Sequence, residues 1–300
     1  MTADILNSIS ESGGVVRQDL LGRDLTTLCV GGLLPVVVTV PSIEVAQKVF
    51  TILHSSGQKA RVIGNGSNLL LPDLGFDSWV IRLSGDLKGT QKIGESTFLV
   101  SAGASLMSLS RDLSSAGFSG LEFAGGIPAT IGGAIFMNAG AHGGEICEIT
   151  KRVTVISPDG EVVVLDSKEL PWRYRYSGLP FGSLVVAAEF ELVPGDKERI
   201  LEKRNECLAE RKKRQPLALP SCGSVFKNPT PEQSAGSVLE NAGMKGFSIG
   251  GAVVSELHAN WIVNPGRNAT ARDVRGVMAE CQRRAKEMAG VDLIPEVQIW

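Results

Sequence analysis

Residues Gly125 to Gly144 read GGIPATIGGAIFMNAGAHGG, and this stretch decides the fold prediction. It contains seven glycines and no Asp, Glu, Lys or Arg. Because glycine lacks a Cβ, it permits positive φ and lets main-chain N–H groups converge closely on an anion. A flexible linker rarely interleaves apolar residues such as Ile131, Ile135 and Phe136. The stretch therefore predicts a phosphate cradle.

The two familiar phosphate-binding loops are missing from the chain. There is no GxxxxGK[ST], which argues against P-loop chemistry. No GxGxxG follows a strand, opens a helix and precedes an acidic residue about 20 positions later. A second glycine loop, GNGSNLLLPDLG at Gly64 to Gly75, indicates only a tight turn by itself. Two separated, lysine-free loops together favour a backbone clamp on a dinucleotide and a flavin fold outside the Rossmann class.

Composition limits the class of protein. A chain of 300 residues with 43% hydrophobic content can bury a full core and divides into two or three lobes. A net charge of −2 provides no general attraction to nucleic acid or to an anionic membrane. The N-terminal MTADILNSISES has no basic segment followed by an apolar core, and no apolar window approaches membrane-spanning length. We expect a cytoplasmic protein.

Cysteine and histidine usage argues against disulfides and metals. The five cysteines are odd in number, widely spaced and without a CxxC, so they indicate neither a disulfide framework nor a zinc site. The three histidines are equally scattered. We expect no catalytic metal.

The first half of the chain alternates strand and helix patterns. Predicted strands cover 35–41, 79–83, 97–101 and 185–192, and 152–156 and 161–166 form a hairpin around SPDG. Ser42 caps a predicted helix that runs to about Ser56, and Ser105 caps one that ends at Gly117. This order is typical of βαβ units.

The composition changes at Gly195. Asp196 caps a long charged helix that Pro216 terminates, and this helix is the most natural lobe boundary. Further helices are predicted over 232–242 and over 270–289, the latter capped by Thr270, and the closing LIPEVQIW resembles a strand. The second lobe is therefore predicted to be a smaller α+β region.

The segment PSCGSVFKNP, residues 220–229, has neither helical nor strand periodicity and predicts a turn. Ser221, Gly223 and Ser224 alone indicate a generic serine-rich turn. A serine hydrolase is disfavoured because GxSxG and an obvious histidine base are both missing.

Six motifs occur here in the order found in one enzyme family: GNGSNLLLPDLG, GGIPATIGGAIFMNAGAHGGE, WRYRYS, GSVFKNP, GMKGFSIGGAVVSELHANWIVN and PEVQ. The chain resembles the UDP-N-acetylenolpyruvoylglucosamine reductase (MurB) family over nearly its whole length. Its shorter middle region resembles the subtype that lacks an extra substrate-capping loop. Each motif alone is weak, but their shared order is specific.

The resemblance implies an α+β architecture: a vanillyl-alcohol-oxidase-type (PCMH-type) FAD-binding fold of two α/β subdomains plus a smaller α+β substrate-binding domain. The implied parts are an N-terminal helix and lead-in over 1–18 and an FAD-binding region over 19–194, with subdomains at about 19–83 and 84–194. The substrate-binding domain would cover 195–300, and its last strand, about 294–300, could return to the FAD-binding region.

The resemblance also implies an activity, UDP-N-acetylmuramate dehydrogenase. Enzymes of the family reduce the enolpyruvyl ether of UDP-N-acetylglucosamine to UDP-N-acetylmuramate for peptidoglycan synthesis, which serves cell-wall biogenesis, cell shape and division. They use noncovalent FAD and take hydride from NADPH. The expected partner is a small nucleotide sugar, with no nucleic acid, no membrane and no obligate protein partner, and the expected state is a monomer.

By motif match, the catalytic residues implied are Ser224 as the proton donor, Arg175 as the cation for the substrate carboxylate, and Glu296 as the group that orients or protonates that carboxylate. Each has a plainer reading from the residues alone. Ser224 would be a turn residue, Arg175 a cation–π surface contact, and Glu296 a solvated strand residue.

The implied cofactor-binding residues lie in the two glycine loops: Gly64, Asn65, Gly66, Ser67, Asn68, Leu69, Gly126, Ile127, Pro128, Thr130, Gly132, Gly133, Ala139 and Gly140. The implied substrate-binding residues are Tyr174, Arg214, Lys227, Asn228 and Lys245, with Arg211 less secure. The residues alone equally favour a solvated helix end for the 211–214 charge run.

The chain departs from the family pattern at Leu25, Ala129, Tyr176 and Trp261, which affects the expected flavin affinity or NADPH fit but removes no catalytic group. His142 stands where the family usually has an aromatic residue, and we expect a structural histidine there rather than a covalent flavin link. Two alternative functions stay open: a flavin oxidase or dehydrogenase of the same superfold with another substrate, and a nonenzymatic nucleotide-sugar binding protein.

Overall fold

The computed structural model describes residues 2–300, which divide into two compact units, each assembled from segments distant in the sequence. The first unit combines the chain up to Gln18 with Pro35–Gly64 and Ser78–Ala209. The second combines Asp19–Leu34, Asn65–Asp77 and Glu210–Trp300. The three-domain division implied by the family resemblance stays a prediction.

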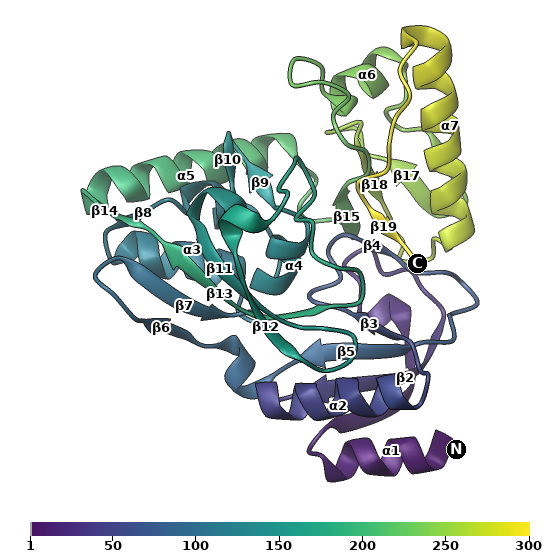
Figure 1. The fold of residues 1–300 in the computed structure, drawn as a ribbon. Helices are drawn as coiled ribbons and strands as arrows, with labels where there is room; N and C mark the ends of the chain where they lie inside the picture. Colours follow the sequence, from purple (N-terminus) through teal and green to yellow (C-terminus); the bar gives the residue numbers. More distant parts are fainter. Residues whose placement is uncertain (1) are drawn as a thin grey trace. The chain divides into compact units, whose positions relative to one another are not determined.

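The first unit contains a βαβ arrangement. Its four-stranded sheet has the order β1 (Val15–Leu21), β2 (Leu33–Val40), β5 (Trp79–Leu83) and β3 (Ala60–Val62), and β5 runs parallel to both β2 and β3. Ser42 caps α2 (Ile43–Ser55) by accepting the Val45 amide, as predicted. Valines of β2 pack with apolar residues of α2 and of α1 (Thr2–Glu11). Figure 1 shows α1 and α2 beside each other at this sheet.

The second sheet of the first unit is antiparallel. Its strand order is β12 (Val162–Asp166), β11 (Thr150–Ile156), β13 (Leu184–Glu191), β7 (Thr97–Ser101) and β6 (Thr90–Lys92). The predicted hairpin around SPDG is confirmed by the pairing of β11 with β12. Ser105 caps α3 (Leu106–Ser115), also as predicted. Apolar residues of α3, α4 (Ile131–Phe136), β7 and β13 form one buried cluster.

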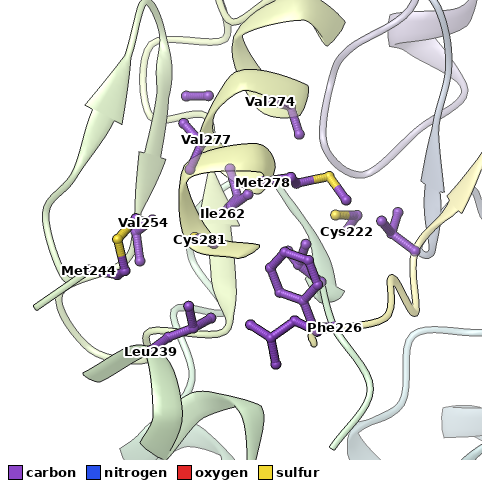
Figure 2. Packing of buried hydrophobic residues seen from close by; sticks show 14 of the residues in the cluster. Cys222, Phe226, Leu239, Met244, Val254, Ile262, Val274, Val277, Met278 and Cys281 are labelled. Atoms are coloured by element: carbon purple, nitrogen blue, oxygen red, sulfur yellow. The ribbon is translucent and has the colours of Figure 1, made fainter. Parts of the chain in front are cut away.

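The core of the second unit lies among α7 (Ala271–Ala289), α6 (Ala235–Asn241) and a sheet of order β15 (Ser221–Ser224), β18 (Trp261–Val263), β17 (Ala252–Val254) and β16 (Ser248–Ile249). Figure 2 shows Val274, Val277 and Met278 of α7 packed with Ile262 and Phe226. Val274, Val277, Met278 and Cys281 recur at helical spacing, so one stripe of α7 is buried.

The turn predicted over residues 220–229 is wrong at Ser221–Ser224, because these residues form β15. Their strand character comes from pairing with β18, which lies about forty residues later in the chain, at Ser221 with Val263 and Ser224 with Trp261. A register shift between the two pairs accompanies Gly223, whose φ is +76°. A strand this short and irregular has no period for a sequence pattern to reveal.

The remaining elements are mostly short. They are α5 (Lys197–Arg214), the parallel pair β4 (Leu69–Leu70) with β19 (Gln298–Ile299), the antiparallel pairs β8 (Phe118–Ser119) with β14 (Val193–Pro194) and β9 (Gly140–Ala141) with β10 (Gly144–Glu145), and 3₁₀ turns at Gly22–Asp24, Gly85–Lys88, Glu122–Gly126, Ile146–Ile149 and Ser167–Glu169. Among residues 2–300, no helix combines the length and apolar character that a bilayer crossing requires.

Candidate active site

Gly64, the first residue of the Gly64–Gly75 loop, contacts the glycine-rich stretch within the first unit. Thr130 caps α4, since its Oγ1 accepts the Gly133 amide at 3.2 Å. Gly64 lies directly against this cap, and a Cβ at position 64 would overlap the Thr130 Oγ1. The start of one loop and the centre of the other are therefore adjacent, as a clamp on one ligand requires.

Several amides of the glycine-rich stretch already have acceptors within the protein. The Ile131 amide donates to Ala104 O at 3.0 Å, and the Gly132 amide donates to Ala102 O at 2.8 Å. These positions therefore contribute shape rather than vacant donors. A Cβ at Gly133 would meet only Thr130 Oγ1, at 3.4 Å, so this glycine leaves open space above the helix start. Such a smooth, side-chain-free surface fits a flat dinucleotide.

Arg175 sits at the tip of a tight turn. Arg173 and Tyr176 exchange two backbone hydrogen bonds of 2.9 Å, and Arg175 itself has φ of +56°. Its Nη2 donates to Gly140 O at 3.0 Å, and its guanidinium lies 4.7 Å from the centre of the Tyr174 ring. The stacking contact expected for an arginine among aromatics is present, but the same guanidinium also contacts the glycine-rich stretch.

Asn138 ties the Arg175 turn to that stretch. This side chain is fully buried, and its Nδ2 donates to Arg173 O at 3.1 Å and to Glu145 Oε2 at 2.8 Å. Its Oδ1 accepts the Cys147 amide at 3.2 Å. Its φ of +42° is a conformation in which asparagine is enriched. Sequence reasoning missed Asn138; an uncharged amide inside a glycine-rich run was the available signal.

Ser224 and Glu296 come together in the second unit. Val225, which follows Ser224, accepts the Glu296 amide at 2.8 Å on one side and donates to Asn260 O at 2.9 Å on the other. Asn260 also brackets Phe226, accepting its amide at 2.9 Å and donating to its carbonyl at 2.8 Å. The serine and the glutamate are therefore fixed on neighbouring segments, and both side chains are half-buried.

The Gly64–Gly75 loop borders these two segments. Asn68 Nδ2 donates to Glu296 O at 3.2 Å, and Asn68 O accepts the Gln298 amide at 3.0 Å. Thr27 bonds both the loop and the serine strand: its amide donates to Gly66 O at 3.1 Å, and its Oγ1 donates to Ser221 O at 2.6 Å. The second unit thus brings Gly66–Leu69 together with Ser224 and Glu296.

The predicted substrate-binding residues have unequal surroundings. Arg214 is exposed and forms an ion pair with Glu210 at 3.1 Å, which is typical of a solvated helix end. Asn228 Oδ1 accepts the Ala235 amide at 3.1 Å at the start of α6. Lys245 forms an ion pair with Glu240 at 2.5 Å. Lys227 follows Phe226 in the chain, and its amide donates to Ile294 O at 2.9 Å.

Arg211 shows a stronger sign of ligand binding than Arg214. Its Nε is buried without a hydrogen-bond partner among the described residues, and so are Gln215 Oε1 and Trp261 Nε1. Burial lowers the pKa of Arg211 to about 10, so the side chain stays cationic at neutral pH. A buried polar atom without a hydrogen bond destabilises the folded protein, so a bound ligand that supplies the missing partner would be favoured at these atoms.

Two further expectations concern cysteine and metal chemistry. Burial raises the pKa of the Cys222 thiol to about 12, so this cysteine beside Ser224 is a packing residue and not a thiolate. In the part of the chain that the structure describes, no group of three or more His, Cys, Asp or Glu is arranged to hold a metal ion.

Comparisons with known proteins identify the family. The UDP-N-acetylenolpyruvoylglucosamine reductase C-terminal domain model matches residues 215–300, and an FAD-binding domain model matches residues 34–166. The reductase of Clostridium beijerinckii is 41% identical over 272 residues, which cover 90% of this chain and 88% of that protein. The chain belongs to the UDP-N-acetylenolpyruvoylglucosamine reductase family.

Other members of the reductase family agree. The Bacillus subtilis reductase is 37% identical over 291 residues, covering 96% of this chain and 95% of that protein. The crystal structure of the Thermus caldophilus reductase aligns with a TM-score of 0.83 at 38% identity and covers 95% of this chain and 100% of that chain. The predicted α+β fold with a vanillyl-alcohol-oxidase-type FAD-binding region is confirmed, and the chain is a flavin-dependent oxidoreductase of peptidoglycan synthesis.

Proposed function

We propose that this chain reduces the enolpyruvyl ether of UDP-N-acetylglucosamine to UDP-N-acetylmuramate, with NADPH as the source of hydride and Ser224 as the proton donor. The observation that carries the proposal is the bonding of the Gly66–Leu69 loop to the Ser224 and Glu296 segments through Asn68 and Thr27. A flavin loop, a hydroxyl and a carboxyl are thereby joined in one unit, as a reductase of this substrate needs.

The chemistry divides between cofactor and protein. FAD held by the two glycine loops would supply the hydride for the β-carbon of the enol ether, and negative charge would then develop on the α-carbon and in the adjacent carboxylate. Arg175 binds that carboxylate with a planar fork, and Glu296 orients it or protonates it. Ser224 then gives its hydroxyl proton to the α-carbon. A serine hydroxyl is a weak acid, so its position next to a strongly basic carbanion makes the transfer effective.

Anaerobic half-reactions test this assignment. Ser224→Ala should leave flavin reduction by NADPH unchanged and slow reoxidation by the enolpyruvyl nucleotide by roughly 10² to 10⁴-fold, because only proton delivery is lost. Ser221→Ala, in the same strand, is the matched control and should reoxidise normally. Equal losses in both half-reactions would assign Ser224 a structural role. A protein that carries no flavin, or whose reduced flavin reacts with oxygen but not with the nucleotide, would favour the alternative functions.

We further propose that Arg211, together with Lys227 and Lys245, binds the diphosphate of the nucleotide. The buried, unpartnered Nε of Arg211 supports this role, since a phosphate oxygen would satisfy it. Arg211→Gln should raise the KM for the nucleotide by roughly 10- to 100-fold, the loss of a charge-assisted hydrogen bond. Lys212→Gln removes an exposed charge from the next position of the same helix and should leave KM nearly unchanged. An equal rise in KM for the two variants would contradict the assignment.

We also propose that the enzyme is a monomer of the cytoplasm, where UDP sugars and NADPH are both available to it. Cell fractionation with detection of the flavoprotein, and light scattering of the purified protein, would check the two points separately.

A further inference from the structure

Asp73 lies near the end of the Gly64–Gly75 loop and reaches α7, almost two hundred residues later in the chain. Its Oδ1 accepts the Ala271 amide at 2.6 Å, and its Oδ2 accepts the Arg272 amide at 3.0 Å. All of these residues belong to the second unit. A carboxylate from the glycine loop is therefore bonded to the first turn of a helix of the C-terminal region.

These two bonds complete the start of α7. The first amides of a helix have no acceptor within the helix. Thr270 and Asp273 form a capping box, in which Thr270 Oγ1 accepts the Asp273 amide at 3.0 Å and Asp273 Oδ2 accepts the Thr270 amide at 2.9 Å. The capping box leaves the Ala271 and Arg272 amides to Asp73. The negative charge also complements the helix dipole.

The opposite part of the loop is held by different partners. Gly66 O accepts the Thr27 amide at 3.1 Å, and Asn68 O accepts the Gln298 amide at 3.0 Å. Close to Asp73, Pro72 O accepts the Gly32 amide at 2.9 Å. The loop is thus held near Gly66 and Asn68 by backbone hydrogen bonds, and near its other end by the Pro72 bond and by the two bonds from Asp73 to α7.

We propose that Asp73 is a positioning residue for the cofactor: by fastening the loop to α7 within the second unit, it holds Asn65–Leu69 in the conformation that binds FAD. The inference rests on the proposed role of these residues in FAD binding. A loop that is ordered before binding loses less conformational entropy when the cofactor binds, so fastening raises affinity without a direct contact.

The test compares two carboxylates that cap the same helix. Asp73→Ala removes the cap that comes from the loop. Asp273→Ala removes the cap that comes from the helix itself, whose carboxylate accepts the nearby Thr270 and Gly251 amides. FAD release is measured from the flavin fluorescence that appears as each purified holoprotein is diluted. We expect a Kd at least 10-fold higher for Asp73→Ala and close to the wild-type value for Asp273→Ala, with similar losses in Tm. Asp73→Asn, which keeps one acceptor oxygen, should be intermediate.

Equal Kd values for the Asp73 and Asp273 variants, or an unchanged Kd in Asp73→Asn and Asp73→Ala alike, would overturn the positioning role. If Asp73→Ala does not fold, the comparison rests on Asp73→Asn against Asp273→Asn. Failure of the proposed function is distinguishable, because then the wild-type protein would carry no FAD or would not be reoxidised by the enolpyruvyl nucleotide.

Discussion

Two fully buried asparagines, Asn138 and Asn264, each join backbone segments that lie apart in the sequence. Asn138 bonds Arg173 O and the Cys147 amide, and Asn264 bonds Leu28 O and the Ala269 amide. Asn138→Ala should lower the free energy of unfolding by about 1–3 kcal/mol, because it leaves buried groups unpaired. It should also slow turnover by roughly 10²-fold, because the turn that carries Arg175 loses its anchor.

Asn264→Ala provides the comparison for this prediction. It removes an equally buried amide, whose bonds are to Leu28 O, Cys29 O and the Ala269 amide. Denaturant unfolding should give a similar loss of stability, while turnover per folded molecule stays within a few-fold of wild type. Parallel losses of turnover in the two variants would mean that Asn138 acts only on stability.

The loop that carries Gly66 shows how one element depends on close backbone approach. Gly66 has φ of +62° and is buried, and a Cβ there would overlap Leu25 O. Gly57 has φ of +66°, with nothing within 4 Å of an added Cβ. Gly57→Ala should therefore cost about 1–2 kcal/mol of unfolding free energy from the left-handed conformation alone. Gly66→Ala should cost more and release FAD, which urea titration and the flavin spectrum of the purified protein would detect. Equal costs and full flavin retention would contradict this.

Elements with local signals were predictable, and elements made by distant pairing were not. The caps at Ser42, Ser105 and Thr270 are confirmed because each depends on residues within one helical turn. Ser221–Ser224 was missed because its strand character comes from β18. The predicted closing strand shrinks to Gln298–Ile299, whose partner β4 lies far away in the sequence.

At the scale of the whole molecule, the order of the motifs predicted the family, the fold class and the cofactor. Local sequence patterns did not predict which distant segments combine into each compact unit. The compact second unit draws residues 19–34 and 65–77 to the C-terminal segment through contacts such as Asp73 with α7 and Thr27 with Ser221. Such contacts depend on which surfaces pack together, and no short stretch of sequence encodes that. For the same reason the candidate site could be named by motif, while Asn138, Asp73 and the orphan Nε of Arg211 needed coordinates.

The pH dependence of global stability should report on His258. The pKa of His258 is lowered from its ordinary value of 6.5, mainly because the ring is partly buried. The negative charge of Glu240 opposes this shift, and the positive charges of Lys245 and Arg214 reinforce it. The ring also packs against Gly236, and its Nδ1 accepts the Asn260 amide. Because the unfolded chain then binds a proton more readily than the folded one, stability from this group is complete above about pH 6.5 and declines as the pH falls towards the folded pKa.

Urea unfolding between about pH 5 and pH 8 measures this slope. His258→Gln should flatten the decline below about pH 6.5, whatever its effect on stability at neutral pH. A slope that persists in His258→Gln would assign the pH dependence to other groups and would mean that the half-buried His258 imidazole accepts its proton as easily in the folded protein as in the unfolded chain.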